Sequence, residues 1–420
     1  MSVKEKQKKV AVIGGGTAGY MAAAHITKHF PCFDLYHIYD SRIPTIGVGE
    51  GTQANFPDWL EQITGLDFDE LQQRCYVTRK FAIQFENWGT KNKQFLHNFH
   101  PIKKEYGYHI SAKSLVNLLE EHVSATRIDK KIIDIKSDGI SVHLTFEDLT
   151  KLDVDLAFDA SGFPKALPNS DSTEISLIPT NAALIHRGSA VDFNSATRSI
   201  ARPYGWIFII PLTTQTSYGY VYNNSINSIS EIEADLNQFL QEENVKPLGE
   251  AKHLTFPNFM RQTFFDGSLF KLGNAASFLE PLEATALGVT LAQICYGSHY
   301  LKELSEFTDR SENFAPSKVK ASNEFLTTML WKVALFVGWH YACGSCFDTE
   351  FWHFAKSNFN QEMKNLKNET LLRTFKRCLE AGSDLNTQLF FPKLDSFRET
   401  FAGFTPASFC EIGYGIGYYS

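Results

Sequence analysis

The chain has 420 residues, which is long enough for two or three domains or for one large core with a cap. Its net charge is −7 and it has no extended basic run, so nucleic acid and anionic membranes are not expected partners. No N-terminal apolar segment resembles a signal peptide, and the apolar runs are too short for a membrane span. The 7 scattered cysteines indicate a cytoplasmic compartment, and Cys343-Gly-Ser-Cys346 has no second pair that would complete a metal site.

The N-terminal segment predicts a dinucleotide-binding turn. Residues 8–13 have the composition of a buried strand, and Gly14-Gly-Gly-Thr-Ala-Gly19 follows them at once. A helix is expected over residues 18–29, and a second strand, residues 33–39, ends at Asp40. The glycines permit a tight turn and a close approach of pyrophosphate to the helix N-terminus, and the acid is placed to bind the ribose. The candidate cofactor-binding residues of this segment are Gly14, Gly16, Thr17, Ala18, Gly19 and Asp40.

Two further segments are expected to approach the nucleotide. The loop from Arg42 to Thr52 contains too many glycines for a strand interior and lies where the phosphates or the flavin would extend. An apolar strand that begins at Leu156 ends in Asp159-Ala-Ser-Gly162, which again allows close backbone approach. Gly49 and Asp159 are the candidate residues of these segments.

A later turn carries two carboxylates. A strand over residues 268–272 leads into the small-residue segment 273–277, and Glu280 and Glu283 follow on either side of a proline. The apolar run 284–292 predicts a helix, whose free N–H groups would face a ligand. A carboxylate at a helix start can also be simply a favourable charge there. Gly273 and Asn274 are further candidates for cofactor binding.

The rest of the chain predicts a β-rich insertion and a helical C-terminal part. Within residues 163–265, Trp206 and Phe208 would lie on one face of a strand, where they could form a core or a pocket wall. Lys80 begins a strand in which Phe81, Ile83 and Phe85 alternate, and a lysine at such a position is usually a surface residue. Helices are expected over residues 56–71, 111–125, 325–341, 351–367 and 371–381.

Four motifs occur in the order found in flavin-dependent tryptophan halogenases. They are Gly14-Gly-Gly-Thr-Ala-Gly19, Gly47-Val-Gly-Glu-Gly-Thr52, Gly205-Trp-Ile-Phe-Ile-Ile-Pro-Leu212 and Gly273-Asn-Ala-Ala-Ser-Phe-Leu-Glu-Pro-Leu-Glu283. The chain resembles this family over about residues 9–300. Lys80 falls where the family has its catalytic lysine, and Glu283 matches the active-site glutamate beside it. Glu280 has no such match and is assigned only to the turn.

The resemblance implies an α/β fold and a chemistry. A Rossmann-like FAD-binding module of the GxGxxG monooxygenase type would comprise residues 1–55, 105–165 and 265–305. A substrate-binding and capping module, with a β-rich region and a helical cap, would comprise residues 56–104, 166–264 and 306–420. FADH2 from a separate NADH-dependent flavin reductase would react with oxygen and halide, either bromide or chloride, to form hypohalous acid. Lys80 would deliver the halogen to an electron-rich aromatic such as indole or tryptophan.

Three departures from the family pattern bear on substrate and halide. Trp206 matches the first tryptophan of the motif that separates substrate from flavin, but Phe208 stands in place of the second. Ala286 replaces a glycine beside Thr285, where backbone N–H groups would bind halide. The C-terminal part is shorter than in halogenases of free tryptophan. A flavin-dependent aromatic hydroxylase and a non-catalytic flavoprotein are the alternatives, and the sequence does not determine the ring position or the oligomeric state.

Overall fold

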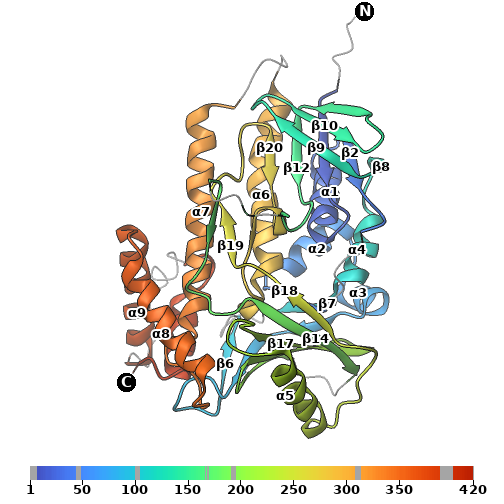
Figure 1. The fold of residues 1–420 in the computed structure, drawn as a ribbon. Helices are drawn as coiled ribbons and strands as arrows, with labels where there is room; N and C mark the ends of the chain where they lie inside the picture. The colour runs from blue at the N-terminus through green and yellow to red at the C-terminus, as the bar shows by residue number, and fades with distance from the viewer. Residues whose placement is uncertain are drawn as a thin grey trace, which may run out of the picture.

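The structure is a computed structural model that describes residues 7–43, 49–99, 105–165, 167, 170–190, 195–307, 314–387 and 401–419. A five-stranded sheet in which every neighbouring pair is parallel lies in the upper right of Figure 1. In spatial order its strands are β20 (Leu269–Lys271), β12 (Leu156–Asp159), β1 (Lys9–Ile13), β2 (Asp34–Tyr39) and β8 (Thr126–Asp129). The chain is therefore a mixed α/β protein with a parallel sheet.

Both faces of this sheet are covered, which explains why β1 is apolar at nearly every position. Val10 and Val12 of β1 belong to the large core beneath α1 (Thr17–His29). Ala11 and Ile13 point the other way, into a separate core formed with an antiparallel meander. The meander consists of β9 (Ile132–Ser137), β10 (Val142–Phe146) and β11 (Lys151–Val154).

A second, seven-stranded sheet contains the predicted β-rich insertion. Its order is β18 (Lys252–Thr255), β14 (Ala182–Ser189), β17 (Gln215–Tyr222), β16 (Gly205–Pro211), β15 (Ala196–Arg202), β5 (Ala82–Glu86) and β6 (Gln94–Asn98). Only β15 and β5 are parallel to each other among the described pairs of this sheet. Trp206 and Phe208 of β16 share one face of the strand, as predicted, and this face belongs to the main core, whereas Ile207 and Ile209 face α5 (Ile229–Glu242). The sequence did not predict α5.

Two small antiparallel sheets connect the large ones. One contains β3 (Gly49–Gly51), β7 (Gly107–Ser111) and β4 (Thr78–Lys80), and the other contains β13 (Ser172–Glu174), β19 (Phe259–Arg261) and β21 (Ser277–Phe278). The single helix expected over residues 56–71 is wrong. It is divided into α2 (Phe56–Thr64) and α3 (Phe68–Cys75), because Gly65 adopts a left-handed conformation with φ of 72° and ends α2.

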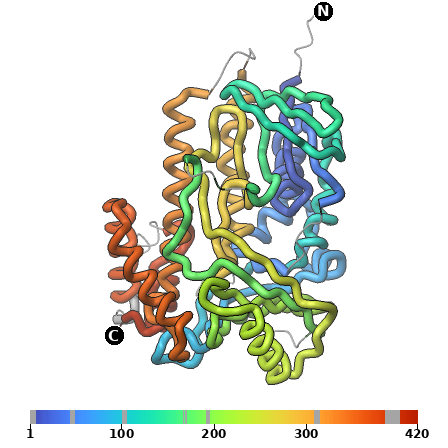
Figure 2. The backbone as a smooth tube through the Cα atoms, viewed as in Figure 1, coloured from blue at the N-terminus to red at the C-terminus, as the bar shows by residue number. Residues whose placement is uncertain are grey.

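Long helices form the C-terminal part of the chain. α6 (Thr285–Glu306) and α7 (Pro316–Trp339) contact each other, and α8 (Glu350–Asn365), α9 (Glu369–Thr387) and α10 (Pro406–Gly415) follow. Figure 2 shows the last helix, in red, beside the light-blue segment that contains β6, and the two elements are in contact. The remaining described helix is α4 (Ala112–Glu120), which Ser111 caps through the backbone N–H of Ser114. The sequence did not predict α10.

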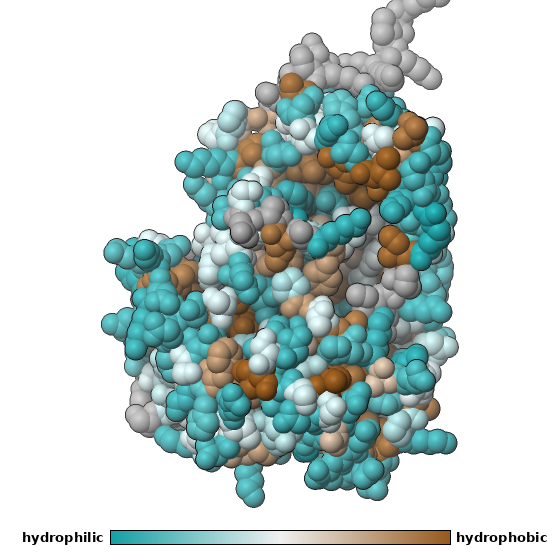
Figure 3. All heavy atoms as spheres, in the orientation of Figure 1, coloured by the Kyte–Doolittle hydropathy of each residue, from teal (hydrophilic) through white to brown (hydrophobic). Residues whose placement is uncertain are grey.

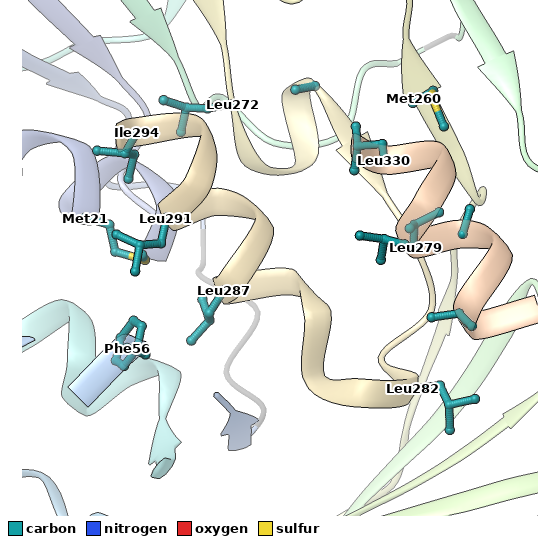
Figure 4. Close-up of a cluster of buried hydrophobic side chains, with 14 of the residues drawn as sticks. Met21, Phe56, Met260, Leu272, Leu279, Leu282, Leu287, Leu291, Ile294 and Leu330 are labelled. Carbon is teal, nitrogen blue, oxygen red and sulfur yellow. The ribbon is translucent and has the colours of Figure 1, made fainter. Parts of the chain in front are cut away.

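The helix α6 anchors the C-terminal part to the parallel sheet. Figure 4 shows Leu287, Leu291 and Ile294 of α6 directed toward Met21 of α1 and Phe56 of α2, and all five side chains are buried.

Polar side chains cover most of the face drawn in Figure 3. In the part of the chain that the structure describes, no helix combines the length and the apolar character needed to cross a membrane.

Candidate active site

Of the three glycines in the turn after β1, Gly16 has space beside it for a side chain, whereas Gly14 and Gly19 do not. Gly14 has φ of 128°, and a Cβ there would lie 2.2 Å from the carbonyl oxygen of Ala160. A Cβ on Gly19 would lie 2.0 Å from the carbonyl oxygen of Gly14, so both positions require glycine. No atom lies within 4 Å of the place that a Cβ on Gly16 would occupy. No described side chain caps α1, so the N–H groups of its first turn, which begins at Thr17, can bind an anion.

The second small-residue turn lies against the first. Gly273 begins a short 3-10 helix, η1 (Gly273–Ala275), which also contains Asn274. Its φ is 55°, and a Cβ there would lie 2.7 Å from the Cβ of Ala18 in the first turn of α1. The backbone N–H of Gly273 donates to the side-chain oxygen of Gln293 at 2.8 Å. The two predicted cofactor turns are therefore in contact, beyond the carboxyl ends of the parallel strands β1 and β20.

The two candidate aspartates lie at the carboxyl ends of β12 and β2, the strands on either side of β1 in the parallel sheet. Asp159 ends β12 in register with Ile13 of β1, and one of its carboxylate oxygens accepts a hydrogen bond from the N–H of Ser161 at 3.0 Å. Asp40 follows β2, and Arg42 donates to both of its carboxylate oxygens, at 2.7 and 2.9 Å. This hydrogen bonding lowers the pKa of Asp40. A ribose hydroxyl would have to share the Asp40 carboxylate with Arg42.

The other glycine loop leads from this region to the candidate lysine. Residues 44–48, which include Gly47, lie outside the described residues. The N–H of Gly49 donates to the hydroxyl of Ser217 at 3.2 Å. A Cβ on Gly51 would lie 3.3 Å from Nζ of Lys80, so the loop passes directly beside the ammonium group.

A lysine at a strand end is usually exposed, but Lys80 is buried. It ends β4 and is 0% exposed. Its Nζ lies 3.5 Å from the carbonyl oxygen of Thr52 and 5.0 Å from the centre of the Phe99 ring. Burial lowers the pKa of Lys80 to about 7, although the negative charge of Glu283 acts in the opposite direction. A lysine with such a pKa can exchange a proton near neutral pH.

Glu283 is held by two buried histidines that the sequence did not single out. It is 3% exposed and has φ of 66° inside the short 3-10 helix η2 (Leu282–Ala284). One carboxylate oxygen lies 2.7 Å from Nδ1 of His97 on β6, and the other lies 2.9 Å from Nε2 of His340, directly after α7. Among the described residues these histidines, and not Lys80, are the ion-pair partners of Glu283. Burial alone would raise the pKa of Glu283, but the two histidines hold it below its usual range.

Glu280 occupies a second buried site on the same turn. Its side chain is 0% exposed and accepts hydrogen bonds from the hydroxyl of Tyr341, at 2.7 and 3.0 Å, and from the hydroxyl of Thr180. Burial raises the pKa of Glu280 to about 7. Glu280 is therefore more than a charge at the turn. The adjacent residues His340 and Tyr341 at the end of α7 bind the two acids of the Glu-Pro-Leu-Glu segment, one each.

The candidate halide residues face the same cavity as the second cofactor turn. A small cavity is lined by Gly273, Asn274, Thr285 and Ala286, among others. Thr285 is buried at the start of α6, whereas Ala286 is exposed. No described side chain caps α6, so the N–H groups of its first turn are directed at this cavity's rim without a competing cap.

The candidate tunnel residues form part of an aromatic layer. The ring centres of Trp206 and Phe208 are 6.2 Å apart, and Trp206 also lies 6.1 Å from the ring of Trp88. Phe208 packs so closely on β17 that a Cβ on Gly219 would lie 2.0 Å from its ring. The indole nitrogen of Trp206 is buried without a hydrogen-bond partner among the described residues. The structure thus places both rings in the core, with Trp206 next to Glu280 and Tyr341.

The buried ammonium of Lys80 predicts an unusual dependence of stability on pH. An unfolded lysine has a pKa of about 10.4, whereas burial lowers the pKa of Lys80 to about 7. Between these values the unfolded chain binds more protons, so the free energy of unfolding rises with pH. We expect Lys80→Met to be more stable than the wild type at pH 7, and the difference to shrink as pH approaches 10. Urea unfolding of both proteins at several pH values measures this, and a constant difference would contradict the assignment.

The comparisons with known proteins agree on one family. A sequence model described as tryptophan halogenase matches residues 9–106 and 101–418, which is nearly the whole chain. Tryptophan 7-halogenase RebH of Lentzea aerocolonigenes is 23% identical over 430 aligned positions that cover 84% of this chain and 79% of that protein. Tryptophan 6-halogenase SttH of Streptomyces toxytricini is 21% identical over 439 positions, covering 83% of this chain and 81% of that protein.

Solved structures show the same fold at similar identity. The crystal structure of SttH aligns with a TM-score of 0.79 and 21% identity, covering 97% of this chain and 90% of that one. BrvH, a flavin-dependent halogenase from Brevundimonas sp. BAL3, aligns with a TM-score of 0.78 and 22% identity, covering 99% and 91%. The chain belongs to the tryptophan halogenase family, whose members are flavin-dependent oxidoreductases.

Proposed function

We propose that this protein is an FADH2-dependent halogenase that forms hypohalous acid at the flavin and halogenates an electron-rich aromatic, such as an indole or a tryptophan-like compound, through Lys80. The observation that carries the proposal is the burial of an ammonium group, 0% exposed, beside the turn that holds Glu283, 3% exposed. Burying a charge is costly unless it serves a partner or a reaction. Lys80 has no carboxylate within ion-pair distance among the described residues, so a structural ion pair does not explain it.

The residues present fit FAD. The open position at Gly16 and the uncapped N-terminus of α1 suit a pyrophosphate, with Gly14, Thr17, Ala18 and Gly19 forming the turn. Gly273 and Asn274 would extend the site, together with Gly49, Asp40 and Asp159. When bound as FADH2, the cofactor supplies the electrons that activate oxygen. We propose Rossmann-like binding by residues 1–55, 105–165 and 265–305, with the remaining segments as substrate module and helical cap.

The protein's own groups would then guide the halogen. The N–H groups of Thr285 and Ala286 at the start of α6 would hold the halide beside the Gly273 turn. Lys80 would donate a hydrogen bond to the oxygen of hypohalous acid, and the carbonyl of Thr52 orients its ammonium group. The aromatic layer of Trp206 and Phe208 would separate the substrate from the flavin. A cytoplasmic NADH-dependent flavin reductase would supply FADH2.

An aromatic hydroxylase or a non-catalytic flavoprotein would not require a buried lysine beside Glu283, and the family relationship does not favour either. The deciding experiment incubates the protein with FAD, a flavin reductase, NADH and either chloride or bromide, together with a panel of indoles and other aromatics. Mass spectrometry would detect halogenated products. Hydroxylated products in the presence of halide, or flavin binding without any turnover, would replace the proposal with one of the alternatives.

Flavin binding should depend on the absence of a side chain at Gly16. No atom lies within 4 Å of the place that a Cβ would occupy there, so Gly16→Leu should fold normally but obstruct the pyrophosphate. We expect FAD titrations to show loss of binding, while the thermal unfolding midpoint without FAD stays near that of the wild type. Binding with unchanged affinity would sink the assignment of this turn.

Bromination should exceed chlorination. Ala286 adds a methyl group to the rim of the proposed halide cavity, and bromide is also the more easily oxidised ion. In mixed-halide reactions we expect mainly brominated product, and Ala286→Gly should increase the chlorinated fraction because it removes the methyl group. Equal or faster use of chloride by the wild type would refute this prediction.

A further inference from the structure

Glu283 is poorly suited to receive a proton from a substrate, because each of its oxygens already accepts a hydrogen bond from a histidine and these contacts lower its pKa. Nδ1 of His97 lies 2.7 Å from one oxygen and Nε2 of His340 lies 2.9 Å from the other. All three side chains are buried, at 3% exposure or less. Water therefore does not compete for these contacts.

The hydrogen-bond partners of His340 show which of its ring nitrogens donate. Nδ1 of His340 lies 2.8 Å from the backbone carbonyl oxygen of Phe336, and a carbonyl oxygen can only accept. Nε2 faces Glu283, whose ionised carboxylate also only accepts. His340 thus donates a hydrogen bond from each nitrogen, one of them to Glu283.

His97 is left with one nitrogen that can act on a substrate. Its Nδ1–H donates to Glu283, so in the neutral imidazole Nε2 carries the lone pair, and Nε2 has no hydrogen bond to a described residue. Phe99 lies one residue beyond the end of β6 and two positions after His97. The ammonium of Lys80 lies over the Phe99 ring, 5.0 Å from its centre, and its charge acts on His97. His97 and the proposed halogen donor therefore lie near each other.

We propose that His97 is the base that removes the ring proton during halogenation, with Glu283 and His340 holding it in the required tautomer. This rests on the proposed function. The ring carbon forms a bond to the halogen of hypohalous acid as the oxygen–halogen bond breaks, and the oxygen leaves with the electron pair and takes a proton from Lys80 to give water. The carbon–hydrogen bond then returns its electron pair to the ring, and its proton moves to Nε2 of His97. This proton must then pass from His97 back to Lys80, and with that return the sum is arene plus hypohalous acid to haloarene plus water.

The charged surroundings suit this role. Glu283 from η2, Lys80 from β4 and Glu411 from α10 act electrostatically on His97, and His340, directly after α7, donates a hydrogen bond to Glu283. Burial lowers the pKa of His97, but the charge and hydrogen bond of Glu283 outweigh it and leave the pKa raised. A raised pKa makes the imidazole a stronger base. The rings of Phe336 and Phe404, 5.9 and 6.4 Å from His97, limit its contact with water.

The test uses a substrate that carries deuterium at the halogenated position, in separate single-turnover reactions of the FAD-loaded protein. The wild type should show no isotope effect, because proton loss is fast. His97→Gln keeps a hydrogen bond to Glu283 but is not a base, so we expect turnover to fall by about 10² to 10⁴ and a primary isotope effect to appear. Imidazole should partly restore His97→Gly. As a control, His25→Gln removes a buried histidine of α1 that binds Trp59 and Ser298, and it should show no isotope effect.

The outcomes separate this proposal from the wider one. In one outcome the wild type forms halogenated product, and His97→Gln is either as fast as the wild type or slow without an isotope effect. His97 is then not the base, and the halogenase function still stands. If the wild type forms no halogenated product, both proposals fail. FAD binding and thermal unfolding show whether each variant is folded. If His97→Gln is not folded, recovery of turnover by His97→Gly with imidazole supports His97 as the base, and no recovery contradicts it.

Discussion

Lys80→Ala is expected to bind FAD and consume oxygen when reduced flavin is supplied, yet to form no halogenated product. Flavin chemistry would take place at the glycine turns, whereas Lys80 lies beside Gly51 and Phe99. Removing the ammonium should therefore stop the substitution without stopping oxygen consumption. Electrostatic and proton-transfer groups each contribute about 10² to 10⁴ in rate, so a loss of several orders of magnitude is expected. Product yield by mass spectrometry and oxygen uptake by electrode measure the two parts separately.

Two companion variants sharpen this result. Lys80→Met fills nearly the same volume without charge, so it separates the loss of the ammonium from the loss of packing. Lys80→Arg should also be inactive, because a guanidinium is larger, planar and always protonated, and the site offers no space for it. Halogenation by Lys80→Ala near the wild-type rate would end the assignment of Lys80 as the catalytic residue.

The parallel sheet and its glycine turn could be predicted from local sequence. β1 is apolar at almost every position, and Gly14, Gly16 and Gly19 follow it at a spacing that a tight strand-to-helix turn requires. The structure places this turn and the Gly273 turn in contact, as expected for one cofactor site. Such motifs are predictable because all their contacts lie within a few residues along the chain or at the ends of neighbouring parallel strands.

The histidines around Glu283 could not be predicted in the same way. His97 and His340 are 186 and 57 residues away from Glu283 in the sequence, and each lies in a segment whose local pattern indicates only structure. The connection to Glu283 comes from the docking of α7 and β6 against the Glu-Pro-Leu-Glu turn, and docking depends on the whole fold.

The predicted helix boundaries were wrong where capping residues determine the ends of a helix. The expected helix over residues 56–71 continues an apolar period through Gly65, but Gly65 takes the left-handed conformation that ends α2. Asp67 then begins α3 with a capping box that includes Glu70, a signal present in the sequence but not used. The helix α5 begins in the same way, with Ser228 and Glu231, inside the region expected to be β-rich.

The two acids of the Glu-Pro-Leu-Glu turn form a matched pair with opposite expected behaviour. Glu283→Gln should reduce halogenation by about 10² or more, because the amide cannot hold His97 and His340 as the carboxylate does. Glu280→Gln should keep most of the activity, because the amide oxygen can still accept a hydrogen bond from Tyr341. The comparison tests whether it is the charge of Glu283 that matters, since both acids are buried on one turn.

Stability should separate the same two variants through its dependence on pH. The histidines hold the pKa of Glu283 below its usual range, so its carboxylate stabilises the fold at pH values above about 4.3, and this contribution is lost as pH falls. Glu283→Gln should therefore cost about 3 to 5 kcal/mol at pH 8. Burial raises the pKa of Glu280 to about 7, so its ionised form lowers stability most above that pH. Urea unfolding at pH 5 and pH 8 should show Glu280→Gln gaining on the wild type as pH rises, and a loss at pH 8 like that of Glu283→Gln would contradict the distinct roles of the two acids.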